Sequence, residues 1–232
     1  MSGRSAQLVL PISVNPGATW SHWVSRKVTG EVESFARALL DQGGAGFFLW
    51  ASEGQGKSHF LQACCAAKPG ARYLPMESLL DYPPEAVLEN AEKETMVVVD
   101  DIHLIDEHRS WQEALFHCFN RCAESGTPFL ASATQSPAGM TSVLADLQSR
   151  LSLLTTFKLP AWELDDFERL LRHLAHDRGL LLSDDVARYL TLRIQRRPQD
   201  AVNVITAIDE STLVEKRSPT IPFLKLLDLL VN

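Results

Sequence analysis

The sequence predicts an α/β domain with a parallel sheet sandwiched by helices over residues 19–160, followed by a four-helix domain over residues 161–232. Short, continuous apolar runs alternate with helical stretches in the first region. Runs of four or five apolar residues are typical of strands covered on both faces, and their alternation with helices implies a parallel sheet. After Pro160 the strand signals stop, and apolar residues recur only at helical spacing.

Residues 1–18 are predicted to form a flexible leader. Turn-forming residues, among them Asn15, Pro16 and Gly17, surround a single apolar island. Because proline lacks a backbone N–H, Pro11 makes a helix unfavourable and keeps the island extended. The island consists of Gln7, Leu8, Val9, Leu10, Pro11 and Ile12.

The elements of the α/β domain follow in order. A helix is expected over residues 29–42, where apolar residues recur at helical spacing and two glycines follow. Further helical stretches cover residues 59–67 and 110–124. The five strands are expected at residues 47–50, 72–75, 96–99, 129–131 and 155–159.

Four amphipathic helices are predicted after Pro160. Gly179 ends the first, Ser183 caps the second and Pro198 opens the third. Each apolar stripe must be buried against another element, so the helices are expected to form one small domain. The stripes comprise Leu164, Phe167, Leu170, Leu171 and Leu174; Val186, Leu190 and Ile194; Ala201, Val204, Ile205 and Ile208; and Phe223, Leu226, Leu227 and Leu230.

Composition and charge exclude several classes of protein. Apolar residues make up 45% and charged residues 22%, which excludes collagen-like, low-complexity and wholly disordered chains. The 22 Lys and Arg residues against 29 Asp and Glu residues give a net charge of −7. The composition shows no basic face for DNA phosphates, so direct DNA contact is expected to be weak or absent. The sequence shows neither a membrane-spanning stretch nor a secretory signal, which predicts a cytoplasmic protein without membrane partners.

The four cysteines do not form a recognised metal-binding pattern. Cys64 and Cys65 are adjacent, whereas Cys118 and Cys122 lie four residues apart in a predicted helix. Neither pair has the spacing of a zinc site. His117 leaves a metal site near Cys118 and Cys122 open as an alternative. A buried helix face is the favoured interpretation, because free cysteine is usually buried.

A phosphate-binding loop is predicted over residues 51–58, between the first strand of the sheet and the helix that follows. Glycines let backbone N–H groups surround phosphate oxygens, and the helix N-terminus contributes the positive end of its dipole. In this pattern Lys57 reaches the β- and γ-phosphates, and the Ser58 hydroxyl ligates Mg²⁺. Ala51 stands where the full motif has glycine, and an ordinary glycine-rich turn is the alternative. The expected nucleotide-binding residues are Gly54, Gln55, Gly56, Lys57, Ser58 and His59.

Two carboxylates follow the third predicted strand. Asp100 and Asp101 come directly after four apolar residues. A carboxylate at a buried strand end is costly unless a cationic group lies next to it. We therefore expect Asp100 to hold the metal ion, through water or Ser58, and Asp101 to orient an attacking water as a base. The alternative is a strand that runs into an acidic surface loop.

Together these motifs resemble those of AAA+ ATPases, and within that superfamily the chain is most similar to the DnaA family of replication initiators. The likeness covers nearly the whole chain. It rests on the phosphate loop, Asp-Asp-Ile at 100–102, the polar Thr134 that ends the next strand, Ser-Arg-Leu at 149–151 and the helical lid. The resemblance implies an AAA+ fold, bound ADP or ATP with Mg²⁺, and a catalytic contact from Thr134.

The resemblance also implies partners and a role. DnaA continues beyond the lid into a DNA-reading helix-turn-helix domain, whereas this sequence stops at the lid, as in DnaA-homologous regulators that switch off initiation. In these proteins the arginine matching Arg150 is a finger that enters the nucleotide site of a neighbouring DnaA and stimulates ATP hydrolysis in trans. A surface ion pair is the alternative role for Arg150.

The leader is similar to the family's binding motif for the DNA polymerase III sliding clamp, its β subunit. Gln7 offers hydrogen bonds, whereas Leu10 and Ile12 offer apolar side chains. Pro11 lowers the entropy that the segment loses on docking. Such a protein would be cytoplasmic and would reach the nucleoid through the clamp. A leader folded onto its own domain is the alternative.

Two departures from the family pattern make independent turnover doubtful. Ala51 is the first. The second is Gln199, which stands at the sensor position of the lid where DnaA-type proteins carry arginine, and a neutral amide lacks that charge. A nucleotide-bound regulator is thus favoured over an efficient ATPase, and a stand-alone ATPase such as a helicase loader is the alternative. Trp20 and Trp23 either stack on the base or belong to the core. The working nucleotide and a possible homodimer stay open.

Overall fold

The computed structural model describes residues 14–226, which form two compact units. The first unit contains residues up to 23, residues 28–53 and residues 57–159. The second contains residues 160–226 together with two short segments, residues 24–27 and residues 54–56. The predicted clamp-binding residues, 7–12, lie outside the described residues.

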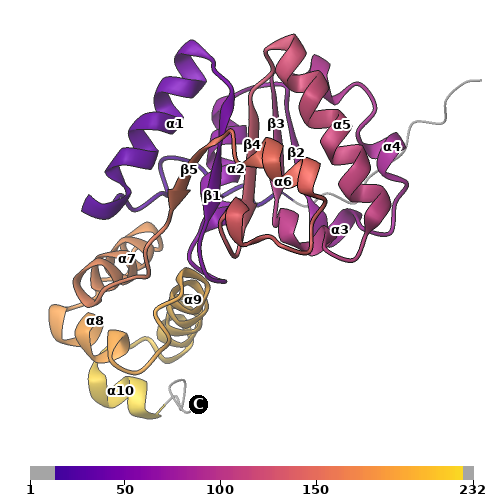
Figure 1. Cartoon of the computed structure of the whole chain (residues 1–232). Coiled ribbons are helices and arrows are strands. Elements are labelled where there is room, and N and C mark those ends of the chain that lie inside the picture. The colour runs from indigo at the N-terminus through magenta and orange to yellow at the C-terminus, as the bar shows by residue number, and fades with distance from the viewer. Residues whose placement is uncertain (1–13, 227–232) are drawn as a thin grey trace, which may run out of the picture. The chain divides into compact units, whose positions relative to one another are not determined.

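The first unit is built on a five-stranded parallel sheet with the order β2-β3-β4-β1-β5 (Figure 1). All five predicted strands are confirmed. Because β4 lies between β3 and β1, the carboxyl ends of these three strands meet at one edge of the sheet. The strands are β1 (Gly46–Trp50), β2 (Ala71–Pro75), β3 (Met96–Asp100), β4 (Phe129–Ala133) and β5 (Thr155–Lys158).

Helices cover both faces of this sheet (Figure 1). Side chains alternate along a strand, so Phe47 and Leu49 pack towards α1 and α2, whereas Phe48 packs in the core shared with α5. The sequence indicated α1, α2 and α5 but not the short helices. The bounds are α1 (Gly30–Gln42), α2 (Lys57–Ala67), α3 (Met76–Leu79), α4 (Pro84–Val87), α5 (Arg109–Ser125) and α6 (Ala145–Leu151), with 3-10 turns at Lys27–Thr29, Ala91–Lys93, Ile102–Ile105 and Pro137–Gly139.

Gly46 allows β1 to approach β4. Its φ is 114°, and a Cβ there would lie 1.9 Å from the Phe129 carbonyl oxygen. A side chain at position 46 would therefore push apart the two strands at the start of their pairing. The close approach keeps β1 in register with β4 up to the phosphate loop.

The end of the predicted leader, residues 14–18, is part of the first unit. Ala18 is buried, and the Asn15 N–H donates a hydrogen bond to Gln62 Oε1 at 2.9 Å. Asn15 Oδ1 in turn accepts the Gly17 N–H at 2.9 Å, which closes a local turn. The boundary expected at residue 18 therefore differs from the structure, because the side chain of Gln62 binds this segment.

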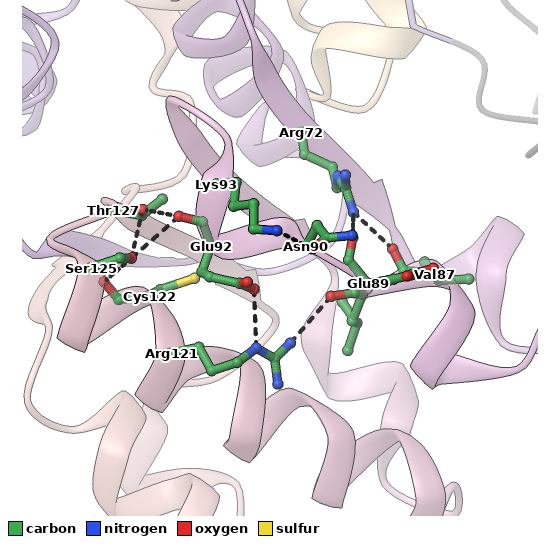
Figure 2. Close-up of polar contacts among 11 residues, drawn as sticks. Arg72, Val87, Glu89, Asn90, Glu92, Lys93, Arg121, Cys122, Ser125 and Thr127 are labelled. Carbon is green, nitrogen blue, oxygen red and sulfur yellow. Dashed lines mark hydrogen bonds and ion pairs between the residues drawn. The ribbon is translucent and has the colours of Figure 1, made fainter. Parts of the chain in front are cut away.

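Two arginines stabilise the connection between α4 and β3 through hydrogen bonds to its backbone and side chains. Figure 2 shows Arg72 donating to the carbonyls of Val87 and Glu89, at 3.2 and 2.8 Å. Arg121 donates to the Leu88 carbonyl at 3.2 Å and to Glu92 at 3.0 Å. These bonds tie the carbonyl groups of residues 87–89 to β2 and α5, and so they hold this connection in place.

The second unit is a helical lid with its own apolar core. Its helices are α7 (Leu164–Asp177), α8 (Asp184–Thr191), α9 (Pro198–Glu215) and α10 (Ile221–Leu226). The Ser183 side chain accepts the Val186 N–H, which confirms the predicted cap. The second helix ends at Thr191, so the expectation that it includes Ile194 is wrong, although Ile194 still packs on the core. Leu227 and Leu230 lie outside the described residues.

Residues 24–27 join the lid through Arg26. Its guanidinium donates to the carbonyls of Pro160 and Ala161, at 2.9 and 3.2 Å, and stacks 4.3 Å from the ring of Trp162. The sequence assigned this segment to the α/β domain, because contacts 134 residues apart leave no local signal. Within residues 14–226, the structure contains no helix long and apolar enough to cross a membrane.

Candidate nucleotide-binding site

The phosphate-binding loop leaves β1 at Ala51 and enters α2 at Lys57. Ala51 is buried, and its N–H continues the ladder to the Ala133 carbonyl at 3.2 Å. Gly54 and Gly56 have φ angles of 71° and 100°, which only glycine adopts without strain. The strand–loop–helix arrangement predicted from the sequence is therefore present, with the N-terminus of an eleven-residue helix at its end.

Lys57 places a buried ammonium inside this loop. Its Nζ lies 3.2 Å from the carbonyl oxygen of Ala51 and 3.5 Å from that of Ser52. It also lies 3.7 Å from Asp101 Oδ1. The ammonium is thus surrounded by oxygen atoms. An anionic phosphate would accept a stronger, charge-assisted hydrogen bond from it than the two carbonyl groups do.

The structure brings Asp100 and Asp101 to this edge in two different settings. Asp100 is the last residue of β3 and is 3% exposed. Asp101 follows in the left-handed conformation, with φ 53°, and its side chain is one-third exposed. The change of backbone conformation separates the carboxylates, so the first is held inside the fold and the second faces Lys57.

Two neutral side chains hold Asp100, and a third supports one of them. Tyr73 donates its hydroxyl to Asp100 Oδ2 at 2.6 Å, and Ser132 donates its hydroxyl to Oδ1. Burial and the nearby Asp100 charge raise the pKa of Tyr73, which keeps the phenol protonated as a donor. Behind it, Gln62 Nε2 donates to the Tyr73 oxygen at 3.0 Å. Sequence reasoning missed these positions, although a serine inside the buried strand β4 was a usable signal.

Asp101 carries a perturbed pKa. Burial raises the pKa of this carboxyl, and the charge of Asp100 adds to the effect, whereas Lys57 opposes it. A carboxyl group with a raised pKa near an ammonium is an arrangement found in functional sites. Its backbone N–H donates to Ser132 Oγ at 2.9 Å, which fixes the residue beside Asp100.

These residues fit a nucleotide with a divalent cation. A carboxylate accepts about four hydrogen bonds or metal contacts, and Asp100 uses one position on each oxygen. Ser58, half-buried in the first turn of α2, offers the hydroxyl. Thr134 lies directly after β4 and is half-buried, at the same edge of the sheet.

The predicted arginine, Arg150, lies exposed on α6. Its guanidinium is 5.9 Å from the ring centre of Phe116, a distance at the outer limit of a cation–π contact. The side chain is therefore not buried in its own fold.

The aromatic residues near the loop belong to the core. Trp23 is buried, and its indole N–H donates to Glu33 at 2.8 Å. Trp20 and Trp23 both pack edge-on against Phe60 of α2, with ring centres 5.1 and 5.0 Å away. His59 is predicted to contact the nucleotide. Its ring centre lies 5.8 Å from that of Trp23, and burial lowers the pKa of His59. The core interpretation of the tryptophans is thus favoured by their packing.

Gln199 and Arg197, at the start of α9 in the lid, have different surroundings. Gln199 is exposed in the first turn of α9 and donates to Asn203 at 2.9 Å. Arg197 precedes that helix, and within the second unit a Cβ on Gly54 would lie 3.1 Å from its Cδ. The methylene stem of Arg197 therefore packs beside Gly54.

Comparisons with known proteins agree with this architecture. Residues 31–157, more than half of the chain, match the family model of the bacterial DnaA ATPase domain, and residues 165–227 match that of the Hda lid domain. An uncharacterized protein of Haemophilus influenzae is 32% identical over 224 residues, which cover 94% of this chain and 96% of that protein.

Solved structures share the fold at low sequence identity. Domain III of the Thermotoga maritima replication initiation protein DnaA has a TM-score of 0.83 at 18% identity, covering 95% of this chain and 100% of that one. A replication initiator DnaA bound to AMPPCP and single-stranded DNA has a TM-score of 0.74 at 16% identity, covering 88% and 69%. The T. maritima RuvB Holliday junction branch migration motor has 0.71 at 15% identity, covering 91% and 71%. The chain therefore belongs to the DnaA-homologous AAA+ proteins, with a DnaA-type ATPase domain followed by an Hda-type lid.

Proposed function

We propose that this DnaA-related protein is a negative regulator of replication initiation. It binds an adenine nucleotide, docks on the sliding clamp through residues 7–12 and supplies Arg150 to a DnaA–ATP complex. The observation that supports it best is the exposed Arg150 on a domain that matches the DnaA ATPase family. A finger that acts on a neighbour must be free of its own core, and Arg150 meets that condition. We expect the protein to act in the cytoplasm.

The nucleotide would bind at the loop with its phosphates on the backbone N–H groups and on Lys57. Ser58 and Asp100, the latter through water, would hold Mg²⁺, and the metal would neutralise phosphate charge. Asp101 is one-third exposed and close enough to Lys57 to orient a water molecule beside the phosphates. Thr134 would offer a hydroxyl at the same edge. The site thereby keeps this protein in its nucleotide-bound form.

Arg150 would act on the ATP of the partner. A guanidinium is always charged and presents a planar set of donors that matches phosphoryl oxygens. An arginine finger supplied in trans accelerates phosphoryl transfer by about 10³–10⁵ in comparable systems. Hydrolysis would convert DnaA–ATP into DnaA–ADP and so end its activity in initiation.

The clamp would raise the local concentration of the two proteins. A single short peptide of this size buries less than a standard interface, so we expect micromolar affinity, roughly −8 kcal/mol. Tethering beside DnaA on the same DNA would strengthen the encounter without new contacts.

Hydrolysis of DnaA-bound ATP, with and without DNA-loaded clamp, tests the proposal. Arg150→Ala is expected to abolish stimulation and keep clamp binding, and Arg150→Lys is expected to restore little because lysine lacks the planar donors. Arg109→Ala is the matched control, since Arg109 is also exposed, on the neighbouring α5. Full stimulation of DnaA-bound ATP hydrolysis by Arg150→Ala would overturn the arginine-finger role of Arg150. Clamp binding by the double variant Gln7→Ala, Leu10→Ala would overturn the assignment of the leader as the clamp-binding segment.

A stand-alone ATPase, such as a helicase loader, is the second candidate. The 3.7 Å approach of Lys57 to the partly exposed Asp101 favours it, whereas the neutral Gln199 disfavours it. ATP turnover in the absence of DnaA, lost in Asp101→Asn, would support this candidate. ATP turnover by the wild type near background in the absence of DnaA would exclude a stand-alone ATPase and favour the regulator.

A further inference from the structure

A continuous chain of hydrogen bonds runs from the segment at residues 14–18, which we call the leader root, to Asp100. The Asn15 N–H donates to Gln62 Oε1 at 2.9 Å, and Gln62 Nε2 donates to the Tyr73 oxygen at 3.0 Å. The Tyr73 hydroxyl then donates to Asp100 Oδ2 at 2.6 Å. Two side chains, Gln62 and Tyr73, thus join the Asn15 backbone amide to the predicted metal-binding acid.

The chain continues past Asp100 to the loop. Ser132 donates to Asp100 Oδ1 and accepts the N–H of Asp101 at 2.9 Å. Asp101 Oδ1 ends the path, 3.7 Å from Lys57 Nζ. All of these residues belong to the first unit.

Donor and acceptor chemistry fixes the direction of every proton along this path. A carboxylate only accepts, so Tyr73 must donate to Asp100, and its lone pair is left for the Gln62 amide nitrogen. The oxygen of the same amide then accepts the Asn15 N–H. Because an N–H can only donate, the reverse orientation of the Gln62 amide would place two donors against each other. Loss of the Asn15 bond would release the Gln62 amide, and Tyr73 would lose the group that orients it.

Burial makes these bonds costly to break. Tyr73, Gln62 and Asp100 are 7%, 9% and 3% exposed. A buried polar group that is left without a partner destabilises the protein by its full desolvation penalty. States in which all of these bonds are formed, or all are rearranged together, are therefore favoured over states in which one bond is broken. Such an all-or-none element lets two sites influence each other.

We propose that Gln62 and Tyr73 are positioning residues that couple the leader root to the nucleotide site through Asp100. Anchoring of Asn15 favours the Asp100 orientation that binds the metal–nucleotide complex, and nucleotide binding favours the anchored root in return. The inference rests on the nucleotide site of the proposed function. It places a nucleotide-dependent anchor three residues after Ile12, the last residue of the predicted clamp motif.

Two readouts on the full chain test this coupling, and neither uses DnaA or clamp. The first is amide hydrogen exchange over residues 14–18 with and without Mg-ADP. The second is the dissociation constant for Mg-ADP from calorimetry. In the wild type we expect Mg-ADP to slow exchange at Asn15 by about 5- to 150-fold, the range of typical coupling energies.

Gln62→Met removes both bonds of the amide while keeping the side-chain length. We expect exchange at Asn15 to become fast and independent of Mg-ADP, and Mg-ADP affinity to fall by the same factor that separates the two wild-type exchange rates, as linkage requires. Tyr73→Phe, which removes a single oxygen, is the second variant. It keeps the bond between Asn15 and Gln62 but breaks the path to Asp100, so exchange at Asn15 should again be independent of Mg-ADP. Gln42→Met on the exposed end of α1 and Tyr82→Phe are the controls and should leave both readouts unchanged.

The outcomes separate this inference from the proposed function. Mg-ADP binding without any change of exchange at Asn15 in the wild type would overturn the coupling alone. An exchange difference that survives in both Gln62→Met and Tyr73→Phe would overturn the assigned path. If the wild type binds no nucleotide at all, the proposed nucleotide site fails and the coupling fails with it.

Discussion

Lys57 Nζ lies 3.7 Å from Asp101 Oδ1 and is enclosed by the carbonyl oxygens of Ala51 and Ser52. The loop therefore presents an ammonium surrounded by oxygen acceptors before any phosphate binds. Phosphate oxygens carry more charge than carbonyls, so they would displace the weaker contacts and keep the ammonium in place. The geometry makes Lys57 the principal cationic side chain of the loop.

Lys57→Ala should weaken Mg-ADP binding strongly. Hydrogen bonds to charged groups contribute about 1.5–3 kcal/mol, which corresponds to a dissociation constant roughly 10- to 150-fold higher. Calorimetric titration with Mg-ADP measures the change. Lys27→Ala, on an exposed lysine, is the matched control and should bind as the wild type does. Equal affinity of Lys57→Ala and wild type would exclude a phosphate contact at this ammonium.

His59 should make the stability depend on pH. Burial lowers its pKa from the ordinary 6.5. As the pH falls through 6.5, the unfolded chain therefore takes up a proton that the folded protein does not, and stability decreases with a limiting slope of about 1.4 kcal/mol per pH unit. Urea unfolding at about pH 7.5 and 5.5 should show a smaller loss for His59→Gln than for the wild type. His117→Gln, on an exposed histidine, should keep the wild-type loss.

Local patterns of sequence predicted the sheet and most of the long helices, because apolar periodicity and caps act within a few residues. The phosphate loop and the Asp pair were predicted for the same reason. The partners of Asp100 were not, because Tyr73 and Ser132 come from other strands, 27 and 32 residues away. Sheet order brings them together, and no short motif encodes that order. The anchoring of Asn15 on Gln62, 47 residues away, was hidden in the same way.

Arg72 should stabilise the first unit through the connection between α4 and β3. Arg72→Met removes its bonds to the carbonyls of Val87 and Glu89 and to the Glu94 carboxylate. The bonds to Val87 and Glu94 are partly buried, and leaving such acceptors without a donor costs about 1–3 kcal/mol, so urea unfolding should show a loss of that size. Arg109→Met breaks only an exposed ion pair with Glu113, so a loss of at most about 1 kcal/mol is expected. Equal losses in the two variants would show that the connection does not depend on Arg72.

Arg26 should stabilise the lid in a way that lysine does not reproduce. Arg26 is 2% exposed, and its guanidinium donates to the carbonyls of Pro160 and Ala161 and stacks on Trp162. Lysine has one nitrogen and no planar face, so Arg26→Lys is expected to lose about 1–3 kcal/mol although the charge is kept. Arg188→Lys changes an exposed arginine of α8 in the same unit and should unfold as the wild type does. Urea unfolding followed by tryptophan fluorescence compares the two. A wild-type midpoint for Arg26→Lys would mean that the charge alone, rather than the planar group, holds residues 24–27 against the lid.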